Sequence, residues 1–281
     1  MRIKYILTHP IQYQSPLLKF LTKKGIKIKV LYRSNVSSKK YYDKGFKKKI
    51  RWDVDLLQGY KYENLKFIGP NKFDSIFPIT IEFGNKIFDG KTNIIWLHGI
   101  KNWYNLIIIL LSRIYNKSIF VRDESHFLIR GVHKKRGFLN YLFNFSLFKI
   151  IDPFIAGYLC IGTANRKFYE NNKIDKKKLY NTPYSVDNAF FYKKTKDKIN
   201  KKINYLYAGK FTFSKGADLL LKSIKNLNKN KNFLNKTNFT FIGDGEIKNE
   251  CMEFAKKNNL INVKFLPFQK KYRDLIKLFF L

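Results

Sequence analysis

The sequence predicts an α/β protein with two domains, the second of them incomplete. Short β-rich runs alternate with helical stretches along the chain, and this order favours parallel sheets whose strands are joined by helices. The alternation stops at a lysine-rich stretch over residues 193–202, which is typical of a linker, and it begins again at residue 203. We therefore expect one domain over residues 1–190 and a partial second domain over residues 203–281.

The first domain opens with a strand, a helix and a second strand. Ser15 and Pro16 predict the start of the helix, because serine caps a helix N-terminus and proline fits its first turn. Leu18 and Leu21 supply a buried face before Gly25 ends the helix. Strands are predicted over residues 3–7, 28–32, 94–97, 119–122 and 158–161, with further helices near residues 103–115 and 138–148.

The second half repeats the same order of elements. Strands are predicted over residues 203–208, 239–242 and 262–266, with helices over residues 215–227 and 247–257. The apolar side chains of these helices recur at helical spacing, which indicates one buried face on each. Loops over residues 209–216 and 243–245 follow the first two strands. This order of elements is that of the first part of a mononucleotide-binding α/β unit.

The net charge of +36 at pH 7 has two functional interpretations. The positive charge could bind nucleic acid, because neutralising the phosphates of the nucleic acid releases counterions, or it could bind an anionic membrane. The excess is mostly lysine spread along the whole chain, and arginine, the better reader of bases, is scarce. We expect most of the charge to be solvated surface, with a weak peripheral attraction to an anionic membrane and no nucleic-acid partner.

Cysteine usage and the N-terminus point to a reducing compartment. Cys160 and Cys251 lie far apart in apolar segments and indicate neither a disulfide framework nor a metal site. The apolar run at the start of the chain is too short for a secretory signal, and no stretch reads as a membrane span. We expect a cytoplasmic protein.

The strongest chemical signal is the loop that follows the strand at residue 203. The strand ends at Gly209, Lys210 comes next, and Lys215 and Gly216 open the following helix. Free N–H groups and the dipole at a helix N-terminus favour an anion, and two lysines would add charge for a diphosphate. The alternative is an ordinary strand–loop–helix turn in a lysine-rich chain.

Polar side chains also follow strands of the first domain. His9 comes just after the first strand, at the edge where such sheets bind ligands, and a hydrogen-bonded loop histidine is the alternative. Asp123 and Glu124 follow the strand at residues 119–122, and we expect one of them to face a ligand, with a surface salt bridge as the competitor. Asp53 and Asp55 mimic a metal-binding Asp-x-Asp pair, but their context favours no metal.

Six stretches, taken in order, resemble family 4 glycosyltransferases. They are residues 8–13, 52–60, 182–188, 205–220, 241–246 and 262–268. The resemblance implies the GT-B fold, in which two Rossmann-like domains face each other. It also implies that the first domain binds the acceptor and the second binds the nucleotide-sugar.

The resemblance assigns the donor site residue by residue. Lys210 and Lys215 would hold the donor diphosphate, between Gly209 and Gly216, beside a turn that contains Gly243, Asp244 and Gly245. They would stabilise charge on the leaving nucleotide. Family 4 members retain anomeric configuration without a bound metal or an assigned nucleophile. Many relatives carry a histidine near position 123, where this chain has Arg-Asp-Glu-Ser, so the catalytic set implied here is Asp123, Glu124 and His9.

The expected function is transfer of a sugar from a nucleotide-sugar to a glycan or lipid-linked acceptor in cell-surface polysaccharide assembly. An epimerase of the same fold, a basic nucleic-acid-binding protein and a non-catalytic remnant are the alternatives. The family's donor domain continues with a Glu-x7-Glu stretch that binds the sugar and ribose, and this chain ends at Leu281 before it. From this ending we expect a truncated donor domain, weak nucleotide binding and no measurable transfer.

Overall fold

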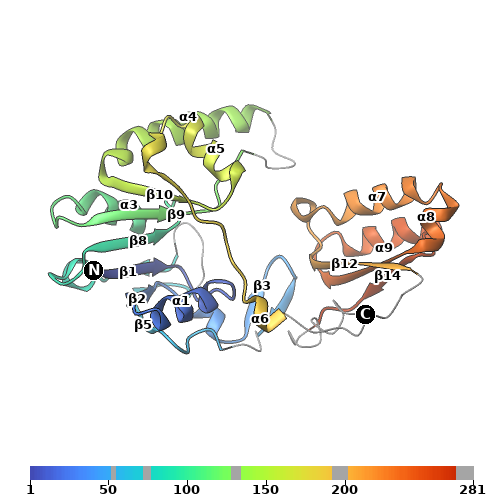
Figure 1. Cartoon of the computed structure of the whole chain (residues 1–281), viewed down its shortest axis with the longest axis horizontal. Coiled ribbons are helices and arrows are strands. Elements are labelled where there is room, and N and C mark those ends of the chain that lie inside the picture. The colour runs from blue at the N-terminus through green and yellow to red at the C-terminus, as the bar shows by residue number, and fades with distance from the viewer. Residues whose placement is uncertain (52–54, 72–76, 128–133, 192–201, 270–281) are drawn as a thin grey trace. The chain divides into compact units, whose positions relative to one another are not determined.

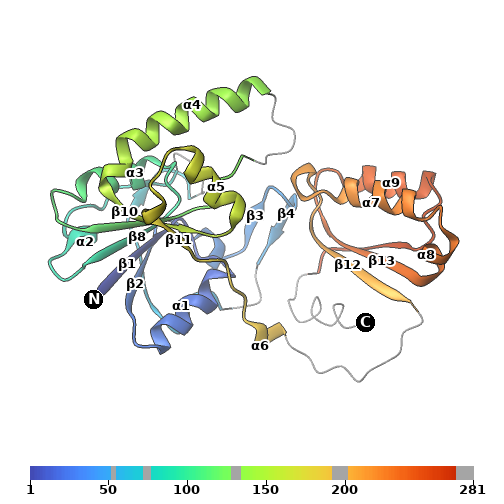
Figure 2. The same cartoon turned by 45° about the horizontal axis from the view of Figure 1, so that its top comes forward.

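The computed structural model describes residues 1–51, 55–71, 77–127, 134–191 and 202–269. Its backbone contacts divide the chain into two compact units. Unit 1 consists of Met1–Lys39 and Asp55–Asp187, and unit 2 of Lys40–Val54 and Asn188–Leu281. Figure 1 and Figure 2 show the elements of both units from two sides.

Unit 1 is built on a seven-stranded parallel sheet. Its strand order is β11-β10-β9-β8-β1-β2-β5, so the chain starts near the centre and builds outward in both directions. The strands are β1 (Arg2–Leu7), β2 (Lys27–Tyr32), β5 (Lys61–Asn64), β8 (Ile94–His98), β9 (Ser118–Arg122), β10 (Ile155–Cys160) and β11 (Leu179–Asn181). The five strands predicted in this half are confirmed, while β5 and β11 carry no clear alternation and were not predicted.

Helices cover both faces of this sheet because successive strand residues point to opposite sides. Tyr5 and Leu7 of β1 pack with Leu18 of α1 (Gln14–Lys23) in one core. Ile6 of β1 belongs to the other core, which includes Ile108 of α3 (Trp103–Leu111). The helices that contribute to this second core are α2 (Asn85–Phe88), α3, α4 (Lys134–Ile151) and α5 (Thr163–Asn171). The arrangement is that of a doubly wound α/β sheet.

Short elements connect the main ones in unit 1. They are the 3₁₀ turns η1 (Val36–Ser38), η2 (Asp152–Phe154) and η3 (Lys176–Lys178), and the antiparallel pair β6 (Phe67–Ile68) and β7 (Ile79–Thr80). No described helix is both long enough and apolar enough to cross a membrane.

Unit 2 carries a three-stranded parallel sheet in the order β12-β13-β14. Its elements are α6 (Asn188–Phe191), β12 (Ile203–Lys210), η4 (Phe213–Lys215), α7 (Ala217–Leu227), α8 (Lys231–Lys236), β13 (Thr237–Asp244), α9 (Lys248–Lys257) and β14 (Val263–Leu266). Leu221 and Ile224 of α7 and Cys251 of α9 pack in one core with Phe241 of β13. The predicted alternation of strand and helix is confirmed here, and the α/β class with Rossmann-like sheets holds for both units.

A hairpin from the first part of the chain also belongs to unit 2. It consists of β3 (Tyr41–Asp43) and β4 (Lys48–Ile50), which pair in antiparallel register. Asp43 and Lys48 form ion pairs with Lys210 and Asp244, the last residues of β12 and β13. The sequence alone assigns residues 40–54 to the first domain, whereas these contacts group them with the second unit.

Candidate functional site

The carboxyl ends of β1, β8 and β9 bring polar side chains together in unit 1. His98 at the end of β8 lies opposite Arg122 at the end of β9. The Tyr5 hydroxyl of β1 lies 3.1 Å from Nδ1 of His98. His9 follows β1 directly, so the predicted residues of this half do share one edge of the sheet.

Asp123 is buried at that edge, with only 6% of its surface exposed. Its Oδ1 accepts hydrogen bonds from the Tyr169 hydroxyl at 2.7 Å, the Ser125 amide at 3.1 Å and the Asn165 side chain at 3.3 Å. The Ser125 hydroxyl donates to Oδ2 at 3.0 Å. This carboxylate therefore holds the loop after β9 against α5.

Glu124, the next residue, is exposed and held by two tyrosines. The hydroxyls of Tyr13 and Tyr184 both donate to Oε1 of Glu124, at 2.8 and 2.9 Å. The two rings lie 4.7 Å apart, and the Arg122 guanidinium lies 4.4 Å from the centre of the Tyr184 ring. The result is an anchored carboxylate beside two aromatic faces, open to solvent.

Tyr13 and Tyr184 were not predicted as site residues. Both lie within stretches that resemble the family, at residues 8–13 and 182–188, but nothing local indicates that either meets Glu124. Burial raises the pKa of the Tyr13 hydroxyl to about 12, and the neighbouring Glu124 carboxylate adds to this effect. Burial raises the pKa of the Tyr184 hydroxyl as well, so both hydroxyls stay protonated near neutral pH and remain donors.

His9 is neutral near pH 7. Burial lowers the pKa of its imidazole to about 4, and the charge that His98 would carry lowers it further. The pKa of His98 is also lowered by burial, although Glu124 and Asp123 partly oppose the shift. Two neutral imidazoles at this edge can exchange hydrogen bonds with a ligand hydroxyl without adding charge.

This neutral state makes stability depend on pH. The folded pKa of His9 lies below the unfolded value of about 6.5, so the contribution to stability is complete above pH 6.5 and is lost as pH falls toward 4. We expect His9→Gln to reduce the loss of unfolding free energy between pH 7 and pH 5 by about 2 kcal/mol, measured by urea denaturation. His126→Gln, at an exposed position, is the control and should follow the unmodified protein. An equal loss in all three proteins would contradict the assignment.

In unit 2, the ends of β12 and β13 come together through glycines. Gly209 and Gly243 are register partners, and a side chain on Gly243 would collide with the Gly209 carbonyl. A side chain on Gly245 would collide with the backbone of Phe211. Both Gly243 and Gly245 have positive φ angles, 142° and 151°. These glycines thus allow the two strand ends to approach closely.

Lys210 and Asp244 stand at this junction, each in an ion pair with the hairpin. Nζ of Lys210 lies 2.9 Å from Asp43 Oδ1 and 5.0 Å from the centre of the Phe46 ring. Burial acts to raise the pKa of Asp244, but the ion pair with Lys48 and the Gly245 amide outweigh it and keep the pKa below its usual value. Lys210 is therefore a cation whose present partner is a carboxylate.

Lys215 and Gly216 lead into α7. Gly216 adopts the left-handed conformation with φ 74° and stands at the N-cap position without a capping side chain. Lys215 is exposed, and in the described part of the chain no carboxylate pairs with it. The first N–H groups of α7 and the Lys215 ammonium together can receive an anion.

Only one of the two aspartates of the Asp-x-Asp motif is among the described residues. Asp53 lies outside them. Oδ1 of Asp55 accepts hydrogen bonds from the amides of Leu57 and Gln58, at 2.9 and 3.2 Å, which is a turn interaction. Within the described ranges, no group of three or more His, Cys, Asp or Glu side chains could hold a metal ion.

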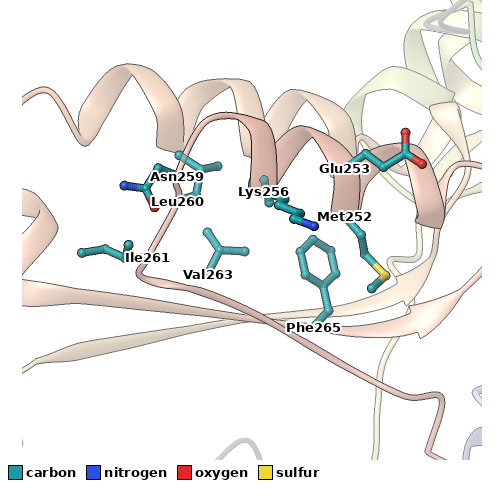
Figure 3. Close-up of a pocket in the computed structure, with 9 residues that line it drawn as sticks. Met252, Glu253, Lys256, Asn259, Leu260, Ile261, Val263 and Phe265 are labelled. Atoms are coloured by element: carbon teal, nitrogen blue, oxygen red, sulfur yellow. The ribbon is translucent and has the colours of Figure 1, made fainter.

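A groove of about 500 Å³ lies beside α9 and β14 (Figure 3). Its lining is largely apolar, and none of it belongs to the predicted site: Met252, Glu253, Ala255, Lys256, Asn259, Leu260, Ile261, Val263 and Phe265. With one carboxylate and one ammonium at its margin, this groove offers a diphosphate no dedicated site.

The lysine loop lies within a stretch that matches a known family. Residues 189–280 match the glycosyl transferases group 1. The match covers α6 and the described part of unit 2 that follows it, including Lys210, Lys215 and the Gly243–Gly245 turn. The comparison with curated proteins found no match.

Solved structures of similar fold extend the likeness to both units. A crystal structure of Anabaena Alr3699/HepE in complex with UDP aligns with a TM-score of 0.60 at 10% identity, over 96% of this chain and 70% of that one. The trehalose-6-phosphate synthase OtsA aligns with a TM-score of 0.58 at 10% identity, over 99% and 76% of the two chains. The lipopolysaccharide outer core galactosyltransferase WaaB aligns with a TM-score of 0.54 at 14% identity, over 96% and 68%. At these identities the alignments establish the shared GT-B fold.

Proposed function

We propose that this protein is a glycosyltransferase that takes its sugar from a nucleotide-sugar. The observation that carries the proposal is the anion-binding geometry of the family-matched stretch. Lys210 ends β12, Lys215 precedes α7, and the α7 N-terminus has no side-chain cap. The diphosphate of the donor is the anion that suits two ammonium groups and a helix dipole.

In the proposal, unit 1 supplies the acceptor side. Glu124 contacts an acceptor hydroxyl, because its carboxylate is exposed and fixed by Tyr13 and Tyr184. His9 contributes a neutral hydrogen-bonding group at the same edge. Asp123 acts as a positioning residue through the hydrogen bonds that hold the Ser125 loop.

The finer assignments follow the resemblance to family 4. We propose a retaining transfer without a metal ion, onto a glycan or lipid-linked acceptor of cell-surface polysaccharide assembly. We also propose a cytoplasmic protein that contacts the inner face of the membrane peripherally. The donor-side glycines of the proposal are Gly209, Gly216, Gly243 and Gly245, and Asp244 orders their turn.

A screen of nucleotide-sugars by native mass spectrometry tests the proposal. We expect at least one nucleotide-sugar to bind, and we expect Lys210→Ala combined with Lys215→Ala to abolish that binding. Titration of single-stranded DNA over increasing salt tests the nucleic-acid alternative, since a phosphate-binding protein shows a steep salt dependence. Failure of every nucleotide-sugar and nucleoside diphosphate to bind would overturn the proposal.

Asp43→Asn is expected to tighten the binding of UDP or GDP by about two- to fivefold, as measured by calorimetry. The reason is that Asp43 competes with the diphosphate for Lys210. Oδ1 of Asp43 also accepts the amides of Gly45 and Phe46, and asparagine retains that acceptor while losing the charge.

Asp55→Asn is the matched control for this change. Asp55 caps two amides in the same way, but its carboxylate makes no ion pair with a described residue. The Asp55→Asn variant should bind UDP or GDP with the same affinity as the unmodified protein. Weaker binding by Asp43→Asn would show that the Asp43 charge supports the site and does not compete with it.

A further inference from the structure

The groove beside α9 and β14 lies at one end of the described sheet of unit 2, because β14 is the last strand in the order β12-β13-β14. Its floor is apolar, and Figure 3 shows Val263 and Phe265 pointing from β14 toward α9. Its rim is apolar as well. Met252 is 44% exposed, and Ile261, in the turn between α9 and β14, is 73% exposed. A projecting isoleucine and an apolar hollow therefore belong to one surface.

Two opposite charges also line this groove. Glu253 and Lys256 are three positions apart on α9, which places them on the same side of the helix. Both side chains are exposed, and neither forms an ion pair with a described residue. We call Met252, Glu253, Lys256, Ile261 and Phe265 the α9–β14 surface. It combines an apolar centre with one anion and one cation that have no present counter-charge.

The charge of this part of the chain differs from the chain as a whole. Residues 244–261 contain four acidic and three basic side chains, a net charge of −1, whereas the whole chain carries +36. Two copies of so basic a protein repel each other wherever both surfaces are positive. Around α9 this repulsion is absent, so a second copy can approach here without it.

Two-fold symmetry makes the α9–β14 surface complementary to itself. In an interface of this symmetry, when residue i of one copy contacts residue j of the other, j of the first also contacts i of the second. Glu253 of each copy can then pair with Lys256 of the other, and Ile261 of each copy can enter the groove of the other. A nucleic acid or an anionic membrane would instead be repelled by the Glu253 carboxylate.

We propose that the α9–β14 surface is a two-fold interface between two copies of this chain. Its centre is formed by Ile261 and Met252 of each copy, and two symmetry-related ion pairs of Glu253 with Lys256 lie at its margin. The inference concerns assembly and goes beyond the proposed sugar transfer. It uses no residue of the lysine loop or of the Glu124 edge, so its failure would leave the proposed function untouched.

Sedimentation velocity of the full chain over rising protein concentration tests the interface. The salt concentration is set to about 0.15 M, where a Debye length of about 8 Å screens much of the net charge. We expect the unmodified protein to form dimers, and we expect Lys256→Glu to weaken the dimer by about tenfold or more, because two like-charge contacts replace two ion pairs. Lys256→Glu also lowers the net charge of each copy by two, so diffuse repulsion alone predicts the opposite result, a tighter dimer.

Exchange of the two charges provides the rescue. Glu253→Lys alone should weaken the dimer as Lys256→Glu does, and the two changes together should return it to within about threefold of the unmodified protein, since the pairs form again with reversed signs. Lys222→Glu, at an exposed position of α7, is the matched control for charge. It should not weaken the dimer.

The apolar contact is tested separately. Ile261→Ser should weaken the dimer by about tenfold or more, because each dimer loses two buried isoleucines. Leu227→Ser is the control, at a position of unit 2 that is 50% exposed and outside the groove, and it should leave the dimer unchanged. Circular dichroism checks that each variant folds.

Three results would overturn the proposal. The first is a monomer at every concentration. The second is a dimer that none of the changes at Glu253, Lys256 and Ile261 weakens, because its interface would then lie elsewhere. The third is weakening by both single charge variants without recovery in the double variant, because the reciprocal ion pairs would then not exist.

Discussion

Lys215→Ala is expected to weaken the binding of UDP or GDP by about 1.5–3 kcal/mol, which is the usual range for a hydrogen bond to a charged group. The ammonium is exposed, and in the described structure no carboxylate holds it. It stands one residue before Gly216, where the free N–H groups of α7 begin. An incoming diphosphate would therefore meet a cation that has no ion pair to break, in contrast with Lys210.

Calorimetry of both nucleotides measures this effect, and Lys222→Ala provides its control. Lys222 is also exposed and belongs to α7, but it lies in the body of the helix and not before its first turn. The control removes the same charge and should leave the affinity within about twofold, because an exposed charge away from a ligand is screened. Equal affinity of the Lys215 variant and the unmodified protein would show that Lys215 does not bind the diphosphate.

Gly243→Ala is expected to destabilise unit 2 by about 2–4 kcal/mol. The added methyl group would collide with the Gly209 carbonyl, and the φ angle of 142° is one that alanine rarely adopts. The colliding atom belongs to the backbone of β12, which pairs with β13, so no side-chain rotation can relieve the contact. Hydrogen exchange of the β12 and β13 amides should therefore accelerate.

Gly209→Ala is the comparison that isolates the cause. Gly209 faces Gly243 across the two strands, yet the atoms nearest to an added methyl group are those of the Tyr207 ring, at 3.7 Å or more. That is an ordinary contact, and we expect a change in unfolding free energy of less than about 1 kcal/mol. Similar protection from exchange in both variants would show that the junction can rearrange.

Most of the fold follows from local pattern. Except for β5 and β11, the strands of the two parallel sheets are runs of largely apolar residues. Pro16 and Gly25 lie close to the two ends of the observed α1, although Tyr13 and not Ser15 stands at its N-cap position. The strand–loop–helix junction around Lys210 and Lys215 was also predictable, because a strand, a glycine, two lysines and a helix follow one another in sequence. These features depend on residues that are close together in the sequence, so a single sequence is enough to predict them.

The partners of the site residues depend on distant parts of the chain. Asp43 and Lys210 are separated by 167 positions, and Tyr13 and Glu124 by 111. No periodicity or spacing connects residues so far apart. Asp123 and Glu124 are adjacent in sequence, yet one is buried under four hydrogen bonds and the other is exposed. The hydrogen bonds that Asn165 and Tyr169 of α5 donate to Asp123 distinguish the two residues.

The β3–β4 hairpin makes unit 2 discontinuous in the chain. Its residues are synthesised well before β12 and β13, so Asp43 and Lys48 emerge from the ribosome long before the residues they pair with. A fragment starting at Asn188 would contain the whole three-stranded sheet but leave Lys210 and Asp244 without their counter-charges. A transplant of unit 2 into another protein therefore has to transfer two separate segments, residues 40–54 together with the C-terminal part, for these two ion pairs to be kept.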